Sequence, residues 1–430
     1  MNCARIVNVT DGTVEISMTV KLSGSLLENE EHVQVALNDA GAAAMEHVLA
    51  RFDTDGSPIV IAGAKLTSRG RQNQTYETPY GQVDVKRHTY QTSQGGRTYC
   101  PLEAAGRTIF NATPRYAKII SSKYCNMGAD SLRTDLLECN GRNVSRNYVK
   151  RISDFVGGIA QAKEEVWEYD LPELDREVVA ISLGLDGTCM LMREGGWREA
   201  MCGSISLYAS DGERLHTIYA GASPEYGKET FHKRFAREIE RVKMRYPEAL
   251  YIGLADGAAD NWSFLENKTN RQVIDFYHAR GYVGQAAAAI HADNRKKVDA
   301  LEEQWSHDLK NKKGAAKRIL NAMEEVLAPM KRGHRMESLK KSVTYFRNHY
   351  EQMQYWRNLE ENLPIGSGVT EAACKTLIKQ RLCASGMRWN DEGAASLISM
   401  RALNLTPERW GMFWSMIDQY GVPSFSQLTA

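Results

Sequence analysis

Residues 177–187 have the sequence EVVAISLGLDG, an apolar run that ends in an aspartate followed by a glycine. A run of this length and composition predicts a strand that is buried on both faces of a sheet. Such strands become polar where they leave the sheet, and functional side chains gather at those ends in α/β proteins. Asp186 is therefore the first candidate functional residue. Because Asp-Gly is also a common turn dipeptide, a plain turn is the alternative.

The segments that follow predict further elements of the same sheet. Their patterns indicate, in order, two strands, a charged amphipathic helix, a strand that ends in Asp256, a helical turn and a last strand. The strands and the helix cover residues 199–210, 214–222, 227–246, 248–256 and 271–279. With the first strand, this order is that of an RNase H-like core, an α/β sheet of mixed direction.

A third acid follows much later in the chain. Residues 364–389, PIGSGVTEAACKTLIKQRLCASGMRW, place a glycine-rich turn before a predicted helix that carries Glu371 in its first turns. A helix packed across the strand ends would bring Glu371 to Asp186 and Asp256. Phosphodiester chemistry uses two hard divalent ions about 4 Å apart, and such ions bind carboxylates. The alternative is an exposed ion pair between Glu371 and Lys375, worth roughly 0.2–0.5 kcal/mol.

The N-terminal part of the chain predicts a mixed α and β region. Alternating apolar residues around an Asp-Gly pair indicate a hairpin over residues 5–22. Helical spacing predicts a helix over 27–52. Residues 58–99 are rich in Thr, Tyr, Val and Gly and predict strands and a β-ribbon. Residues 117–159 are predicted to be helical.

This helical part contains a pattern typical of a helix-turn-helix. The pattern breaks at Asn140-Gly141, and Ser145 is a good N-cap for a second helix. Basic residues decorate the second helix and are candidate DNA contacts; they are Arg142, Arg146, Lys150 and Arg151. The alternative is an ordinary helical hairpin with a solvated basic face, because the motif is short and common.

Residues 284–362 are predicted to form a highly charged helical insertion. Between Lys310 and Tyr350 there are 11 Lys and Arg against 3 Glu, a local excess of +8. An excess this one-sided favours binding to phosphates, although a solvated helical surface is the alternative. The candidate contacts are Lys312, Lys313, Lys317 and Arg318.

The composition of the whole chain limits the function classes. The 430 residues carry a net charge of only +1, so any argument for nucleic acid has to be local. The eight cysteines form no C-x-x-C pair and no zinc-finger spacing, so we expect reduced thiols and no zinc. The start of the sequence lacks the apolar core of a signal peptide, and no apolar run is long enough to cross a bilayer. We therefore expect a soluble, cytoplasmic protein.

Four motifs stand out in the second half of the chain: GLDGT (184–188), GLADGAADNW (253–262), IDFYHA (274–279) and PIGSGVTEAACK with SGMRW (364–389). Together they resemble the DDE transposases of the ISKra family of bacterial insertion sequences, which are related to Mutator-like transposases. The similarity runs over roughly residues 176–414 and is weaker over residues 117–159.

The resemblance implies an RNase H-like catalytic core with a helical insertion before the last acid. It implies that Asp186, Asp256 and Glu371 are the catalytic, metal-binding triad, with two Mg²⁺ or Mn²⁺ ions per active site. Asp275 and His278 resemble an accessory Asp-x-x-His motif, expected to brace the active site or touch the DNA end without binding catalytic metal. Further candidate DNA contacts follow Glu371; they are Lys375, Lys379, Arg381, Arg388 and Trp389.

The resemblance also implies an activity and partners. The protein is expected to bind the terminal inverted repeats of an insertion sequence through its N-terminal ribbon and helix-turn-helix. It would then cleave the DNA and join the freed 3′-OH to target DNA. The partners would be double-stranded DNA and at least one further copy of the chain, in a nucleoid-associated complex. Many relatives carry a Cys-rich segment near residues 87–106, whereas this chain has only Cys100 there, which argues against an N-terminal zinc site.

These inferences predict six regions. They are an N-terminal hairpin and helix (1–56), a β-ribbon (57–105), a helical DNA-binding region (106–170), the first part of the core (171–283), the insertion (284–362) and the C-terminal part of the core with the Glu-bearing helix (363–430).

Three other functions remain compatible with the sequence. A nuclease or resolvase of the same fold would cut DNA without joining it. A DNA-binding regulator derived from a transposase would have lost catalysis, which the presence of all three acids disfavours. A carboxylate-based glycosidase would need neither the basic insertion nor the helix-turn-helix. The DNA end sequence, the target preference, the transposition pathway and the number of subunits are left open.

Overall fold

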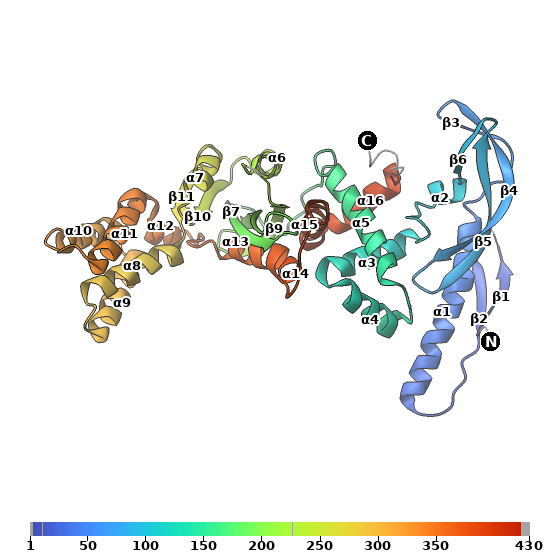
Figure 1. Ribbon diagram of the computed structural model, residues 1–430, viewed down its shortest axis with the longest axis horizontal. Coiled ribbons are helices and arrows are strands. Elements are labelled where there is room, and N and C mark those ends of the chain that lie inside the picture. Colours follow the sequence, from blue (N-terminus) through green and yellow to red (C-terminus); the bar gives the residue numbers. More distant parts are fainter. Residues whose placement is uncertain (1–2, 11, 226, 423–430) are drawn as a thin grey trace. The chain divides into compact units, whose positions relative to one another are not determined.

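The computed structural model of the protein describes residues 3–10, 12–225 and 227–422 (Figure 1). These residues form two compact units. The first unit contains the chain up to Tyr169, residues 399–404 and the C-terminal residues from Arg409 on. The second unit contains Asp170–Ile398 and Leu405–Glu408. The catalytic region predicted for residues 363–430 is therefore shared between the two units.

The first unit begins with a hairpin and a long helix, as predicted. Strands β1 (Ala4–Val9) and β2 (Val14–Met18) pair in antiparallel fashion. Of the predicted turn dipeptide, Asp11 lies outside the described residues. Helix α1 (Leu26–Ala50) begins with a capping box, in which the Ser25 side chain accepts from the Glu28 backbone and the Glu28 side chain accepts from the Ser25 backbone.

A four-stranded antiparallel sheet packs on α1. Its order is β3 (Ile59–Ile61), β4 (Ala64–Glu77), β5 (Gln82–Thr92) and β6 (Gly95–Tyr99). Tyr76, Val83 and Val85 form a small core with Leu49 of α1. The predicted strands and ribbon over residues 58–99 are thus confirmed, and their buried face is fixed by this apolar cluster.

Helices complete the first unit: α2 (Pro101–Ala105), α3 (Pro114–Asn126), α4 (Ala129–Asn140), α5 (Arg146–Lys163) and α16 (Arg409–Tyr420). Gly141 ends α4 in the left-handed conformation, with φ of 64°. Ser145 caps α5 by accepting from the backbone of Tyr148. The two predicted helices and the glycine turn between them are therefore confirmed.

The second unit is built on a mixed five-stranded sheet. Its order is β11 (Arg271–Ile274), β10 (Leu250–Ala255), β7 (Ala180–Leu191), β8 (Trp197–Tyr208) and β9 (Arg214–Ala222). Strands β7, β10 and β11 are parallel, and β8 and β9 are antiparallel to their neighbours. The predicted α/β class, the mixed direction and the order of elements along the chain are confirmed.

The first strand is longer than the sequence predicts. It does not end at Asp186 but continues to Leu191, because β8 pairs with it along its whole length and Cys202 is the partner of Asp186. The Asp-Gly pair at 186–187 is therefore not a turn.

Helices cover both faces of this sheet. On one face, α6 (Glu229–Arg245) buries Phe235 against Gly203 of β8. On the other face, α13 (Gly368–Ala373) lies against Gly184 of β7 through Thr370. Ser204, which bonds Thr370, follows Gly203 directly in β8. Consecutive residues of a strand face opposite sides of the sheet, so α6 and α13 lie on opposite faces. The chain continues from α13 into a π-helical stretch, η3 (Cys374–Lys379), then α14 (Gln380–Leu382) and α15 (Asp391–Leu405).

The insertion is helical, as predicted, but it starts earlier. Residues 271–279 were predicted to be a strand, whereas β11 stops at Ile274 and α8 begins at Phe276. The reason is local, because the Asp275 side chain caps α8 by accepting from the backbone of His278. The remaining elements of this region are α7 (Ala259–Leu265), η1 (Glu266–Lys268), α8 (Phe276–Ile290), α9 (Arg295–Asn311), α10 (Ala315–Leu327), α11 (His334–His349), η2 (Tyr350–Gln352) and α12 (Tyr355–Glu360). Among the described residues, no helix has the length and apolar character that a membrane span requires.

Candidate active site

Three aspartates lie in register at the ends of, or within, neighbouring strands of the second unit. In the parallel ladders, Leu254 pairs with Gly184, and Ala255 pairs with Ile274. Two residues further along β7 and β10 come Asp186 and Asp256. Asp256 and Asp275 each follow by one residue the last pair of β10 and β11, which is Ala255 with Ile274. The strand register alone therefore puts the three carboxylates in one row, with neighbouring strands about 4.8 Å apart.

Glu371 approaches this row from the helix that crosses the sheet. Gly184 faces Thr370, and Asp186 lies two residues further along the same strand, so its side chain points to the face that α13 covers. Burial raises the pKa of Asp186, and the negative charges of Asp256 and Glu371 raise it further. The three carboxylates proposed from the sequence thus lie close enough to interact electrostatically.

The first two acids are held in place by short local contacts. Asp186 Oδ1 accepts from the Gly187 backbone at 2.7 Å, and its Oδ2 accepts from Cys374 Sγ at 3.6 Å. Asp256 Oδ1 accepts from the Ala258 backbone at 3.1 Å. Asp186 and Asp256 are half-buried and Glu371 is exposed. The predicted alternative for Glu371 is not formed, since the described residues contain no ion pair between Glu371 and Lys375.

Asp275 is completely buried and joins three segments. Its Oδ2 accepts from the Ser367 backbone at 2.5 Å, and its Oδ1 accepts from the His278 backbone at 2.7 Å. Ser367 Oγ lies 2.9 Å from Asp275 Oδ2 and 3.1 Å from Glu371 Oε1, so its single proton can be donated to either. Asp275 therefore connects the start of α8 to the loop before α13.

Besides Asp186, Asp256 and Glu371, a second set of potential metal ligands lies in this region, and it also includes Glu371. One ligand atom each from Asp275, His278 and Glu371 lie within 4.8 Å of one another. His278 Nδ1 is 3.3 Å from Asp275 Oδ1, and its side chain is half-exposed. Both oxygens of Asp275 already accept hydrogen bonds, which suits a residue that orients its neighbours. Glu371 is common to both sets.

Sequence patterns did not indicate several residues that surround the acids. Cys202 and Cys374 are both buried beside Asp186, and a hydrogen bond with Cys374, together with burial, raises the pKa of Cys202. Tyr345 of the insertion donates its hydroxyl to the backbone oxygen of Asp256 at 3.1 Å. Only Cys374 had a usable signal, because it follows Glu371 at helical spacing.

The basic residues after Glu371 divide into two groups. Lys375, Lys379 and Arg388 are exposed. Arg381 is buried, with its guanidinium 5.5 Å from the centre of the Trp389 ring. Trp389 donates its indole N–H to the Leu382 carbonyl and forms a β-bridge with Met192 beyond the end of β7. Arg381 and Trp389 thus fasten this segment to the sheet.

The basic residues of the helix pair, which is α4 and α5, mostly contact other residues of the first unit. Arg142 precedes α5, is buried, and binds the Glu77 carboxylate and the Thr78 carbonyl. The guanidinium of Arg151 lies 4.6 Å from the centre of the Phe110 ring. Arg146 and Lys150 are exposed and pair with Asp130 and Asp154.

The basic residues of the insertion face solvent. Lys312, Lys313, Lys317 and Arg318 are all exposed. Lys312 pairs with Asp308 at 2.7 Å, and Lys317 lies 4.6 Å from the centre of the Tyr350 ring. These contacts leave the cationic groups accessible at the surface.

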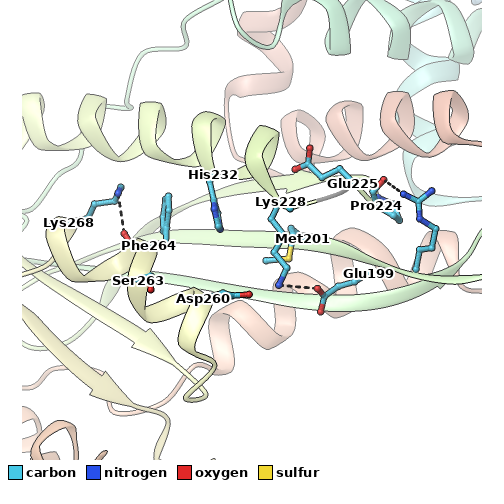
Figure 2. Close-up of a pocket in the computed structure, with 12 residues that line it drawn as sticks. Glu199, Met201, Pro224, Glu225, Lys228, His232, Asp260, Ser263, Phe264 and Lys268 are labelled. Carbon is cyan, nitrogen blue, oxygen red and sulfur yellow. Dashed lines mark hydrogen bonds and ion pairs between the residues drawn. The ribbon is translucent and has the colours of Figure 1, made fainter.

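A cavity of about 570 Å³ lies on the α6 face of the sheet (Figure 2). Its lining contains a ring pair, His232 and Phe264, whose centroids are 4.7 Å apart. Lys228 closes one side through a 3.0 Å ion pair with Glu199. Asp186 points to the opposite face, so this cavity is separate from the row of acids.

The chain was compared with protein-family models and with curated proteins, and nothing in either comparison matches it. The case for function therefore depends on the geometry and on the motifs.

Proposed function

We propose that this protein is a DDE-type DNA transposase that binds the terminal inverted repeats of an insertion sequence, cleaves the DNA and transfers a strand. The observation that carries the proposal is the convergence of Asp186, Asp256 and Glu371 from β7, the end of β10 and α13. These three segments are distant in the sequence, so an accidental cluster of acids is a poor explanation.

The architecture around the acids supports the proposal. The mixed sheet has the order β11-β10-β7-β8-β9, with the first acid on the central strand and the second at the end of its parallel neighbour. This is the arrangement expected of an RNase H-like core. The motifs that resemble ISKra-family transposases contain all three acids, and the helical insertion lies before the last one, as that resemblance implies.

The donor set fits divalent cations. Carboxylates are the ligands that Mg²⁺ and Mn²⁺ prefer. Burial and then the charges of Asp256 and Glu371 raise the pKa of Asp186, and a cation would offset this cost of ionising it. Asp186, Asp256 and Glu371 would hold the ions, and Asp275 with Ser367 would orient Glu371. Two bound ions would activate water and stabilise the leaving oxygen in an in-line displacement at phosphorus. Cleavage and strand transfer are both displacements of this kind, so one site would serve both.

DNA would be held by cationic surfaces and by more than one copy of the chain. The exposed lysines and arginines of the insertion are suited to phosphate contacts. Bringing two DNA ends together requires at least a dimer in the working complex.

The test is incubation of the purified protein with DNA from either side of its gene, in the presence of Mg²⁺ or Mn²⁺. We expect nicks at one position at each end and, with added plasmid, joining of the new 3′ ends. Cleavage without joining would support the RNase H-like nuclease instead. Binding without cleavage, even with Mn²⁺, would support a regulator.

Matched variants make the assignment specific. Glu371→Gln should abolish cleavage and joining while DNA binding persists, because it removes a ligand charge and keeps the side-chain size. Glu360→Gln is the control, since Glu360 is an exposed acid at the end of α12. Near-normal strand transfer by Glu371→Gln would overturn the triad.

A further inference from the structure

Strands β4 and β5 of the first unit form a long two-stranded ribbon that is anchored to α1 and to the residues that follow it. On one face, Tyr76, Val83 and Val85 pack on α1. On the other face, Asp53, which follows α1, binds both the backbone and the ring of His88. Thr54 and Tyr90 share a 2.6 Å hydrogen bond. The ribbon is therefore a rigid platform, which a recognition surface needs in order to be selective.

The face that carries His88 is exposed and polar beside that residue. Arg71 and Asn73 lie on the same face as Lys86, because they pair with His88 and Lys86 in the ladder. The hydrogen bond between Thr75 and Asp84 confirms this register. All three side chains are exposed; Arg71 lies 3.8 Å from Asp53, yet 59% of its side chain is accessible. Asn73 and Lys86 have no side-chain partner in the part of the chain that the structure describes.

A β-bulge directs further polar groups outward. Between Ser68 and Arg71, two residues of β4 oppose one residue of β5. Gly70 adopts φ of 86° there, a conformation that favours glycine. The bulge presents Arg69 beside Gln91, to which it donates at 3.1 Å. Strand β3 pairs with residues 64–66 only, and Glu77 at the far end of β4 forms a bridge with Ala112, so within the described residues no strand pairs with the outer edge of β4 over residues 67–74.

The charge on this surface is predominantly positive. Between residues 57 and 100, all of which the structure describes, the only exposed acid is Asp84. The exposed cations in the same range are Lys65, Arg69, Arg71, Lys86 and Arg97. The helix pair differs, because Arg142 is buried on Glu77 and the exposed Arg146 and Lys150 pair with exposed acids. Accessible cations together with amides are the groups that bind phosphates and base edges.

We propose that the exposed face of the β4–β5 ribbon, with Arg69, Arg71 and Asn73 at its centre, recognises base pairs of the element ends in a DNA groove. The inference rests on the proposed function and assigns sequence selectivity to the ribbon instead of the helix pair. A two-stranded ribbon fits the major groove of B-DNA. Arginine bonds guanine there through two parallel hydrogen bonds, and asparagine bonds adenine in the same way.

The test uses the full-length protein and a duplex library with 30 random base pairs, from which bound DNA is selected and sequenced. The wild-type protein is expected to enrich one motif. The Arg71→Lys variant keeps the charge but loses the paired hydrogen bonds, so it should retain affinity for random duplex within about twofold and lose preference at one position of the motif. Asn73→Ala should lose preference at a neighbouring position, and each should weaken binding to the selected motif roughly 5- to 100-fold.

The matched control removes cations from the helix pair. Arg146→Ala with Lys150→Ala deletes two exposed charges and should lower affinity for the selected and random duplexes equally. Each variant is first checked for an unchanged melting temperature. If the ribbon variants enrich the wild-type motif with unchanged affinity, this inference is overturned and the proposed function stands. If the wild-type protein binds no duplex, both are overturned.

Discussion

Asp186 is the residue on which the electrostatics of the candidate site depend. It lies inside a strand and is half-buried, with two further carboxylates nearby. Burial, and then the charges of Asp256 and Glu371, disfavour its ionised form. The hydrogen bonds from Gly187 and Cys374 offset only part of this cost. A site of this kind is less stable without a cation than with one, so the proposed metal binding would be coupled to folding.

The first prediction concerns this coupling. In the presence of a chelator at neutral pH, Asp186→Asn should melt at a higher temperature than the wild type, because it removes an ionised, repelled carboxylate. The pKa of Asp186 is raised above its ordinary 3.8, so the penalty exists above the raised pKa and disappears as the pH falls towards 3.8. Thermal melts from pH 7 down to pH 4 should show the two proteins converging. An equal or lower melting temperature of Asp186→Asn at pH 7 would contradict the electrostatic account.

The second prediction concerns Ser367, which joins Asp275 to Glu371. Ser367→Ala should raise the Mn²⁺ concentration needed for half-maximal cleavage, because Glu371 loses the hydroxyl that orients it. The maximal rate at saturating Mn²⁺ should change less than the metal requirement. Ser263→Ala, a change at an exposed serine of α7, is the control. An unchanged metal requirement with a lower melting temperature would show that Ser367 has only a structural role.

At the scale of elements, the contact between α13 and the central strand decides where Glu371 lies. Gly184 allows this contact, since a Cβ at this position would overlap Thr370 Oγ1. Thr370 also bonds Ser204 at 2.8 Å, which fixes the helix over β7 and β8. The π-helical stretch that follows keeps Cys374, Leu377 and Ile378 buried against the sheet.

The third prediction tests this contact. Gly184→Ala should destabilise the protein by about 1–3 kcal/mol and abolish cleavage, because the helix that carries Glu371 must move away from the strand. The double variant Gly184→Ala, Thr370→Ala should recover part of the stability and activity, since the overlapping hydroxyl is gone. Denaturant melts and cleavage rates measure both effects. If the single variant cleaves normally, the helix position is not set by this contact.

The fourth prediction concerns the basic insertion. Replacing Lys312, Lys313, Lys317 and Arg318 together by Ala should weaken DNA binding with little change in sequence preference. The slope of log affinity against log salt should flatten by about 0.9 for every phosphate that these side chains no longer neutralise. Affinities of the variant and the parent over a salt series give this slope directly. Parallel lines would exclude phosphate binding by these residues, and failure of subunit assembly would identify a dimerisation element instead.

At the scale of the whole molecule, the two units share the C-terminal part of the chain. Helix α15 contributes to both, and α16 belongs to the first unit, where Phe413 packs edge-on against Trp167 with centroids 5.7 Å apart. Arg107 also donates to the Asp418 carbonyl at 2.9 Å. Helix α16 therefore stabilises the N-terminal unit.

The fifth prediction follows from this division. Phe413→Ala removes a fully buried ring and should cost about 3–5 kcal/mol in the first unit. Hydrogen exchange should increase in α3 and α5 and stay unchanged in β7 and β10, and the stabilisation by Mn²⁺ should persist. Faster exchange in β7 and β10 as well would show that the two units unfold as one.

The sequence by itself determined the elements whose cause is local. Apolar runs predicted the strands of the core, the break at Asn140-Gly141 and the capping Ser145 predicted the two helices, and helical spacing predicted α1. The three candidate acids were also named from the sequence, because polar residues at the end of an apolar strand or at the start of a helix are visible as patterns. The motifs that resemble a transposase family added a function to these positions, and that function remains a proposal.

The tertiary structure decided what depends on residues far apart in the chain. The pairing of β7 with β8 shows that Asp186 lies inside a strand, and the ladder register places Asp275 in the same row. Burial of Arg142 and Arg381 separates structural cations from exposed ones, which a count of charges does not do. The physical reason is the same in each case, since register, burial and pairing are set by the partner segment, and the partner is chosen only when the chain folds.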